Sequence, residues 1–232
     1  MTFDDLYAQL RALGSEATRT FYLRHGFGDN TFGVSFAQLG ALKKQLVGRG
    51  KDKAVAHQLA RQLWQSGNYE ARTLATMLAD AQQFTPADAD AWAADVRNHG
   101  LADALAGLVA GTDFAWATAA AWTATAGEYP QRLGYALLSR LALQDNAASD
   151  AAFLPYVARI EQELQRAPNR AKEGMNGALI AIGGRSEALR QRVEEAADRI
   201  GPVVIDHGAT ACQTPAIRPY LAKMWARKAV KA

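Results

Sequence analysis

The chain has 232 residues, 49% hydrophobic and 21% charged, a composition that excludes a disordered or fibrous protein. Its single cysteine, Cys212, excludes an intramolecular disulfide, and its N-terminus has no signal-peptide pattern, so we expect a cytoplasmic location. No stretch reaches the ~18 apolar residues that span a bilayer, and a net charge of +3 permits an anionic partner without requiring one.

Apolar residues at helical spacing predict an all-α fold. Between residues 187 and 200, for example, Leu189, Val193, Ala196 and Ile200 mark one face of a 3.6-residue helix. Strand patterns are nearly absent. In chain order, we expect helices at 3–13, 16–25, 36–48, 51–66, 69–82, 86–98, 100–110, 114–126, 130–144, 150–166, 170–183, 187–200 and 215–229.

Capping signals support these boundaries. Ser35, Thr85 and Ser186 each stand where a helix should begin, and Pro86 follows Thr85 at the first helical position. Short connections make neighbouring helices pack as antiparallel pairs, and stacked pairs form an α-α superhelix of repeats with a concave face. A compact helical bundle is the alternative. We see no clear domain boundary and expect one domain over residues 1–232, in which 145–150 is the most linker-like stretch.

Basic residues gather in two places. Residues 43–53 carry five cations, beginning with Lys43 and Lys44, against the single acid Asp52, and residues 218–232 carry five cations and no acid. Such clusters suit a polyphosphate partner. A solvated helix face or a frayed tail would explain either cluster equally well.

Few residues suggest catalysis or metal binding. The sequence has no Walker loop, dinucleotide fingerprint or HExxH, so we expect no cofactor. Asp206, His207 and Cys212 share one loop, but their spacing favours a loop that pins the last helix, with Cys212 buried, over a metal site. Asp103 interrupts an apolar run, where it serves either as a helix-start charge or as a placed functional group.

Several segments, taken in order, resemble one known family. They are Phe21-Tyr22-Leu23-Arg24, Leu63-Trp64-Gln65-Ser66 with Tyr69-Glu70-Ala71-Arg72, Val96 to Asp103, Gln131-Arg132-Leu133-Gly134, and Met175 to Gly183. Together they are similar to the DNA alkylation repair family, the HEAT-like repeat alkylpurine DNA glycosylases. The resemblance covers most of the chain.

The resemblance implies a HEAT-like superhelix that holds double-stranded DNA, alkylated or branched, in a concave basic cleft, and a monomer without a membrane partner. It also implies excision of cationic alkylated purines, in which Asp103 stabilises the developing oxocarbenium ion and orients water. Arg132 would contact the DNA backbone near the lesion. The residues that we expect to contact DNA in the same way are Lys43, Lys44, Tyr22, His99 and Arg72.

The sequence also departs from that family. Its active enzymes place tryptophans where this chain has His99 and, in the helix that includes 175–183, Gly177. Trp92 or Tyr135 could take their place as aromatic walls. Three hypotheses therefore stay open: a DNA glycosylase, a DNA-binding protein without catalysis that recognises damaged or branched duplex, and a scaffold that binds protein on its concave face.

Overall fold

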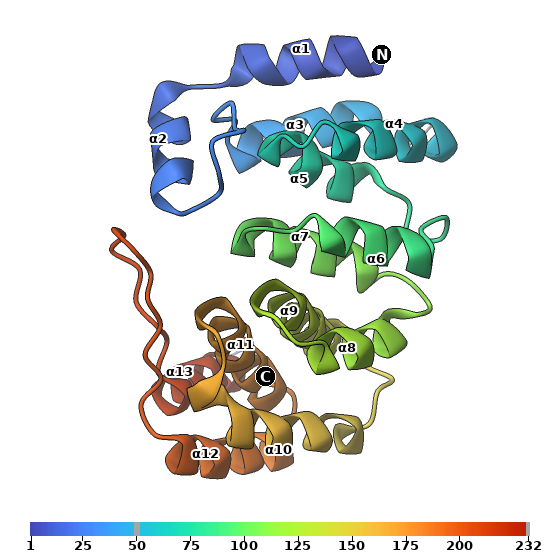
Figure 1. Ribbon diagram of the computed structural model, residues 1–232. Coiled ribbons are helices and arrows are strands. Elements are labelled where there is room, and N and C mark those ends of the chain that lie inside the picture. The colour runs from blue at the N-terminus through green and yellow to red at the C-terminus, as the bar shows by residue number, and fades with distance from the viewer. Residues whose placement is uncertain (49–51, 231–232) are drawn as a thin grey trace. The chain divides into compact units, whose positions relative to one another are not determined.

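The structure is a computed structural model that describes residues 1–48 and 52–230 (Figure 1). Within these ranges it contains thirteen α-helices, two short 3₁₀ helices and no strand. The α-helices are α1 (Phe3–Leu13), α2 (Glu16–Arg24), α3 (Phe36–Leu46), α4 (Lys53–Gln65), α5 (Tyr69–Leu78), α6 (Pro86–Ala94), α7 (His99–Val109), α8 (Ala115–Ala124), α9 (Glu128–Gln144), α10 (Leu154–Glu163), α11 (Asn169–Gly183), α12 (Glu187–Ile200) and α13 (Ile217–Ala229).

Each helix predicted from the sequence is present, and the predicted caps are confirmed. Ser35, Thr85 and Ser186 all accept a hydrogen bond from a backbone N–H in the first turn of the helix that follows. Three predictions were too long: the helix expected over 69–82 ends at Leu78, the one over 86–98 ends at Ala94, and residues 150–166 are not a single α-helix. They form α10 with a 3₁₀ turn at each end, and Pro155 lies in the first turn of α10, where a missing N–H costs nothing.

The helices group into two compact units. Unit 1 comprises residues 1–114 with 208–210, and unit 2 comprises residues 115–207 with 211–232, of which 231 and 232 lie outside the described residues. The expectation of one domain over 1–232 stays a prediction, and the two units are described separately.

In unit 1, α5 is the central helix, and it packs against α3, α4 and α7. Its residue Glu70 is fully buried and fastens the chain that joins α2 to α3. The Glu70 carboxylate accepts hydrogen bonds from the Thr31 hydroxyl (2.6 Å) and from the N–H groups of Phe32 (3.1 Å), Gly33 (2.6 Å) and Val34 (3.0 Å). Four donors satisfy a buried carboxylate, so this segment is held in one conformation.

A second polar cluster joins α4, α5 and α6. Trp64 and Trp92 stack with ring centroids 4.1 Å apart, and the indole N–H of Trp64 donates to Asp95 at 2.9 Å. Arg72 donates to the same carboxylate at 2.8 Å and to the Trp64 carbonyl at 3.0 Å. This cluster orients three helices of unit 1 relative to one another.

In unit 2, α9 packs between α8 and α11. Gly134 makes the close approach of α8 and α9 possible, because a Cβ at this position would lie 2.4 Å from the Thr123 backbone nitrogen. The remaining helices of the unit, α10, α12 and α13, share with α9 and α11 one continuous apolar core.

The segment 145–150, the most linker-like part of the sequence, is firmly held inside unit 2. Arg185 donates hydrogen bonds to the carbonyls of Ala142, Asp145 and Ala148, at distances of 2.6 to 3.0 Å. The indole N–H of Trp116 donates to the Asp145 carboxylate at 2.8 Å. This segment therefore acts as a packed connection between α9 and α10.

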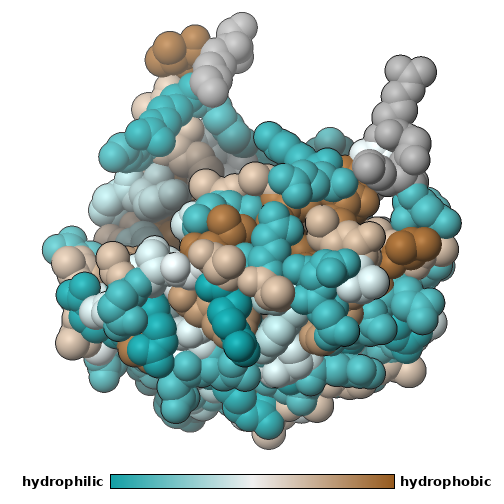
Figure 2. Space-filling view, turned by 90° about the horizontal axis from the view of Figure 1, so that it is seen from above, coloured by the Kyte–Doolittle hydropathy of each residue, from teal (hydrophilic) through white to brown (hydrophobic). Residues whose placement is uncertain are grey.

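Hydrophilic side chains dominate the face seen in Figure 2, where hydrophobic ones appear in scattered groups. Among the described residues, no helix is both long enough and apolar enough to cross a membrane.

Candidate nucleic-acid interface

Asp103 lies in the second turn of α7, a helix capped by the Asn98 side chain. The first turn of α7 contains no acidic residue, so Asp103 is not a helix-start charge. Neighbouring positions Leu101, Ala102 and Leu105 are buried, whereas Asp103 is half-buried. A carboxylate held at the edge of an apolar helix face can act on a ligand at the surface of unit 1.

An aromatic cluster lies beside Asp103. The Phe27 ring is stacked on Tyr69 at 4.7 Å between centroids, and it lies 5.0 Å from the His99 ring and 5.3 Å from the Tyr22 ring. His99 precedes Asp103 by one helical turn. Phe27 thus brings together two residues that the sequence predicted for the site, Tyr22 and His99, and Asp103 lies one helical turn beyond His99.

Sequence reasoning missed Phe27, although it left a signal. Phe27 stands between Gly26 and Gly28, whose φ angles of 71° and 86° belong to the left-handed region that favours glycine. A third glycine, Gly100, admits the ring to α7, because a Cβ there would lie 2.8 Å from both Phe27 Cε1 and the Tyr69 hydroxyl oxygen. A glycine-flanked aromatic residue in a loop is the pattern that identifies it.

The electrostatics of this cluster favour neutral tyrosines. Burial, and secondarily the charge of Glu70, raises the pKa of Tyr22 to about 12. Burial also raises the pKa of Tyr69 strongly, with smaller contributions from Tyr22, Glu70 and Asp103. Tyr22 is 3% exposed and donates its hydroxyl to the Val34 carbonyl at 2.8 Å, so it supports the cluster from inside the core. Its predicted contact with DNA stays a prediction.

The expected replacements for the pocket tryptophans are not available. Trp92 is stacked on Trp64 and is 6% exposed, while Tyr135 is fully buried in unit 2. At the second position, Gly177 is exposed on α11, and, apart from its own stretch of helix, no described part of the chain lies within 4 Å of the place that a Cβ would take. Neither Trp92 nor Tyr135 therefore supplies an aromatic wall at the position of His99 or of Gly177.

Arg132 lies on α9 in unit 2 and is 7% exposed. Its guanidinium is 3.2 Å from the Glu173 carboxylate, which also pairs with Arg170 at 3.0 Å. Both arginines thus share the Glu173 carboxylate, and the backbone N–H of Arg170 also donates to the Glu128 carboxylate at 2.7 Å. Asp103 and Arg132 belong to different units, and their convergence on one groove stays a prediction.

The other side chains predicted to contact DNA differ in whether they already form hydrogen bonds or ion pairs within the protein. Arg72 is committed to Trp64 and Asp95. Lys43 and Lys44, by contrast, are exposed in the last turn of α3, and their side chains form no ion pair or hydrogen bond with another described residue. The predicted cations Arg49, Lys51 and Lys231 lie outside the described residues.

The loop between α12 and α13 corrects one expectation. Cys212 is exposed, whereas the sequence predicted a buried thiol. The loop is anchored instead by Asn169, whose side chain exchanges two hydrogen bonds of 2.7 Å with the backbone of Asp206. His207 lies against the Thr214 hydroxyl at 3.1 Å. No group of three or more metal-ligating side chains occurs within residues 1–48 and 52–230.

Comparison with known proteins adds an independent line of evidence. A family model described as "DNA alkylation repair enzyme" matches residues 6–210. The chain is 28% identical to uncharacterized protein Lmo0209 of Listeria monocytogenes and 27% identical to uncharacterized protein Lin0241 of Listeria innocua. In both cases the match covers 96% of this chain and 97% of the relative.

One solved structure matches the fold with a TM-score of 0.87 at 23% identity, over 98% of this chain and 95% of the other. It is described as "a new family of proteins related to the HEAT-like repeat DNA glycosylases with affinity for branched DNA structures". The predicted all-α fold of HEAT-like repeats is therefore confirmed.

Proposed function

Because this chain belongs to the DNA alkylation repair enzyme family, we propose that it binds branched or damaged duplex DNA through phosphate contacts and does not need to excise a base. The affinity for branched DNA that is attributed to the similar solved structure supports this proposal. Base excision by Asp103 is the second candidate.

The observation that carries the proposal is that the two positions expected to hold aromatic side chains around a damaged base, His99 and Gly177, do not present a free aromatic face. His99 is already in contact with Phe27, a residue of the same unit, at 5.0 Å between ring centroids. Gly177 offers no side chain, and the space around its Cβ position is open. A cationic purine is held by cation–π contacts with aromatic faces, so it would find little at either position. DNA binding through phosphates needs neither wall.

The electrostatics support phosphate binding. Lys43 and Lys44 are exposed and make no ion pair with another described residue, so they can replace the counterions of DNA without breaking an existing contact. Arginines such as Arg199, which pairs with Glu161, are in contrast already neutralised. Free cations of this kind contribute affinity that is independent of sequence and sensitive to salt.

A binding measurement tests the proposal. Fluorescence anisotropy compares a four-way junction with a linear duplex of the same composition over a range of salt concentrations. We expect tighter binding of the junction and a loss of affinity with rising salt. The double variant Lys43→Gln/Lys44→Gln should lower the salt slope by about 1.8, from roughly 0.9 for each phosphate contact. Equal affinity for both DNAs, or no dependence on salt, contradicts the proposal.

The matched control removes two charges that are already paired. In Arg192→Gln/Arg199→Gln, both arginines lose their contact with Glu161. Net charge then falls by the same amount as in the lysine variant, but the salt slope should stay close to that of the unmodified protein. If both double variants behave alike, long-range charge and not a contact at Lys43 and Lys44 accounts for binding.

The second candidate rests on Asp103, which is half-buried one helical turn from His99, the residue whose ring contacts Phe27. A carboxylate in this setting could stabilise an oxocarbenium ion. Release of methylated purines from alkylated duplex DNA separates the two candidates. Excision predicts release that Asp103→Asn abolishes, whereas binding without excision predicts no release above that of the variant.

A further inference from the structure

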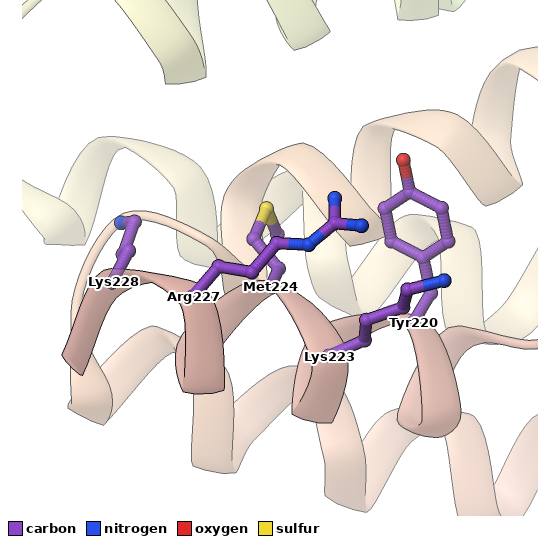
Figure 3. Close-up of a pocket in the computed structure, with 5 residues that line it drawn as sticks. All are labelled: Tyr220, Lys223, Met224, Arg227 and Lys228. Atoms are coloured by element: carbon purple, nitrogen blue, oxygen red, sulfur yellow. The ribbon is translucent and has the colours of Figure 1, made fainter. Parts of the chain in front are cut away.

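A groove of about 390 Å³ lies along α13 in unit 2, within the basic segment 218–232 of the sequence (Figure 3). It is lined by Tyr220, Lys223, Met224, Arg227 and Lys228, which follow the pattern i, i+3, i+4, i+7 and i+8 and so share one face of the helix. Figure 3 shows the side chains of Lys223 and Arg227 extending on the side of the helix where the Tyr220 ring stands.

Two of the three cations that line this groove are unpaired within the described part of the chain. No acidic residue occurs in α13, and two of its four cations already have partners. Arg218 pairs with Glu194 and Asp198, and Lys228 donates to the Gly184 carbonyl. The other two, Lys223 and Arg227, form no ion pair or hydrogen bond with any residue of the described ranges. They lie one helical turn apart, about 6 Å along the axis.

The rest of the groove is apolar and partly fixed. Tyr220 is 48% exposed, although large aromatic residues usually bury most of their surface. Met224 packs onto the core of unit 2, and its side chain occupies the space that a Cβ at Gly184 would take, with the Met224 methyl carbon 2.7 Å from that position. The indole N–H of Trp225 donates to the Gly183 carbonyl at 2.9 Å and so anchors α13 to α11. Along α13 the exposed Tyr220 ring thus precedes the two cations that are unpaired among the described residues, and Met224 lies between these cations.

We propose that this groove binds an unpaired nucleotide of a DNA strand. The base stacks on Tyr220 and packs against Met224, and Lys223 and Arg227 hold adjacent phosphates. Proteins that bind single strands combine an aromatic platform with a cationic track in this way. Bases in a duplex are stacked within the helix and do not reach a side chain such as Tyr220. The inference extends the proposed function, because a branch point is where a duplex offers unpaired bases.

Charge complementarity selects this occupant over a protein partner. A wholly apolar partner would leave Lys223 and Arg227 desolvated without an anion, which is costly. An acidic peptide would satisfy the cations but would not require an aromatic ring. Tyr220 therefore distinguishes a nucleotide from an acidic peptide.

The test measures binding of a labelled oligothymidine to the full chain by fluorescence anisotropy. Tyr220→Ala should weaken binding about tenfold, which is within the range for one stacked base, while Tyr220→Phe should bind like the unmodified protein. Lys223→Gln/Arg227→Gln should lower the salt slope by about 1.4, from roughly 0.7 for each phosphate of a single strand. Arg192→Gln/Arg199→Gln, which removes two paired charges, is the matched control.

Three results would overturn the inference. The first is that Tyr220→Ala binds oligothymidine as well as the unmodified protein does, and the second is that Tyr220→Phe loses as much affinity as Tyr220→Ala. The third is that polyglutamate displaces oligothymidine equally well from the unmodified protein and from Tyr220→Ala. A four-way junction measured in parallel separates this failure from failure of the proposed function. If the junction binds normally and oligothymidine does not, only the groove assignment is wrong. If neither binds, both proposals are wrong. Circular dichroism and thermal unfolding confirm that each variant is folded.

Discussion

Replacing the buried carboxylate of Glu70 should destabilise unit 1 more than any other single charge change. The structure gives Glu70 four hydrogen-bond donors, and three of them converge on Oε1 at 2.6 to 3.0 Å. In Glu70→Gln the amide oxygen can still accept those three. The amide nitrogen then faces the Phe32 N–H, which donated at 3.1 Å, and two donors oppose each other. One lost bond and the loss of charge assistance should cost about 2 kcal/mol.

Glu70→Ala removes every acceptor. Two of the orphaned backbone donors, Gly33 and Val34, belong to buried residues, and each unsatisfied buried group costs about 1–3 kcal/mol. We expect a loss of about 3–6 kcal/mol in the free energy of unfolding, a large part of the ~5–15 kcal/mol that is typical of a domain.

Urea denaturation followed by tryptophan fluorescence measures both losses, since Trp64 and Trp92 report on unit 1. Glu16→Gln is the control, because the Glu16 side chain is 79% exposed and its pairing with Arg19 at 3.8 Å contributes little. If Glu70→Gln and Glu16→Gln unfold at the same urea concentration, the four-donor account of Glu70 is wrong. Faster proteolysis between α2 and α3 in Glu70→Ala would support it.

Three further predictions follow from packing and from pKa. Gly134→Ala should lower the free energy of unfolding by about 2 kcal/mol or more, and with it the midpoint of thermal unfolding, because its Cβ would meet the Thr123 backbone nitrogen at 2.4 Å and the backbone cannot move aside easily. Asp95→Ala removes the acceptor of the Trp64 indole and should cost about 1–2 kcal/mol in urea denaturation. Folding raises the pKa of Tyr22 from 10.0 to about 12, so the contribution of its neutral hydroxyl to stability is complete below pH 10 and is lost as the pH rises towards 12. Phenolate absorbance that appears only on unfolding would confirm this prediction. Ionisation of Tyr22 near pH 10 in the folded protein would contradict it.

Local chemistry was sufficient for the secondary structure. The spacing of apolar residues and the caps at Ser35, Thr85 and Ser186 act within one helical turn, so the sequence predicted every helix with small errors at the ends. The pairing of helices and the family resemblance could also be predicted from the sequence, because short connections and the order of motifs are properties of the chain itself. Asp103, Lys43 and Lys44 could be singled out by residue type alone.

The tertiary structure decided which polar residues are free to act. Glu70 and Arg72 look like surface charges in the sequence, yet one is fully buried against the backbone at 31–34 and the other is committed to Asp95. Phe27 reaches His99, more than seventy residues away, because folding brings a glycine-flanked loop against α7. Such contacts depend on distances across the fold, which no local pattern encodes, and they determine whether a charged or aromatic side chain supports the structure or meets a ligand.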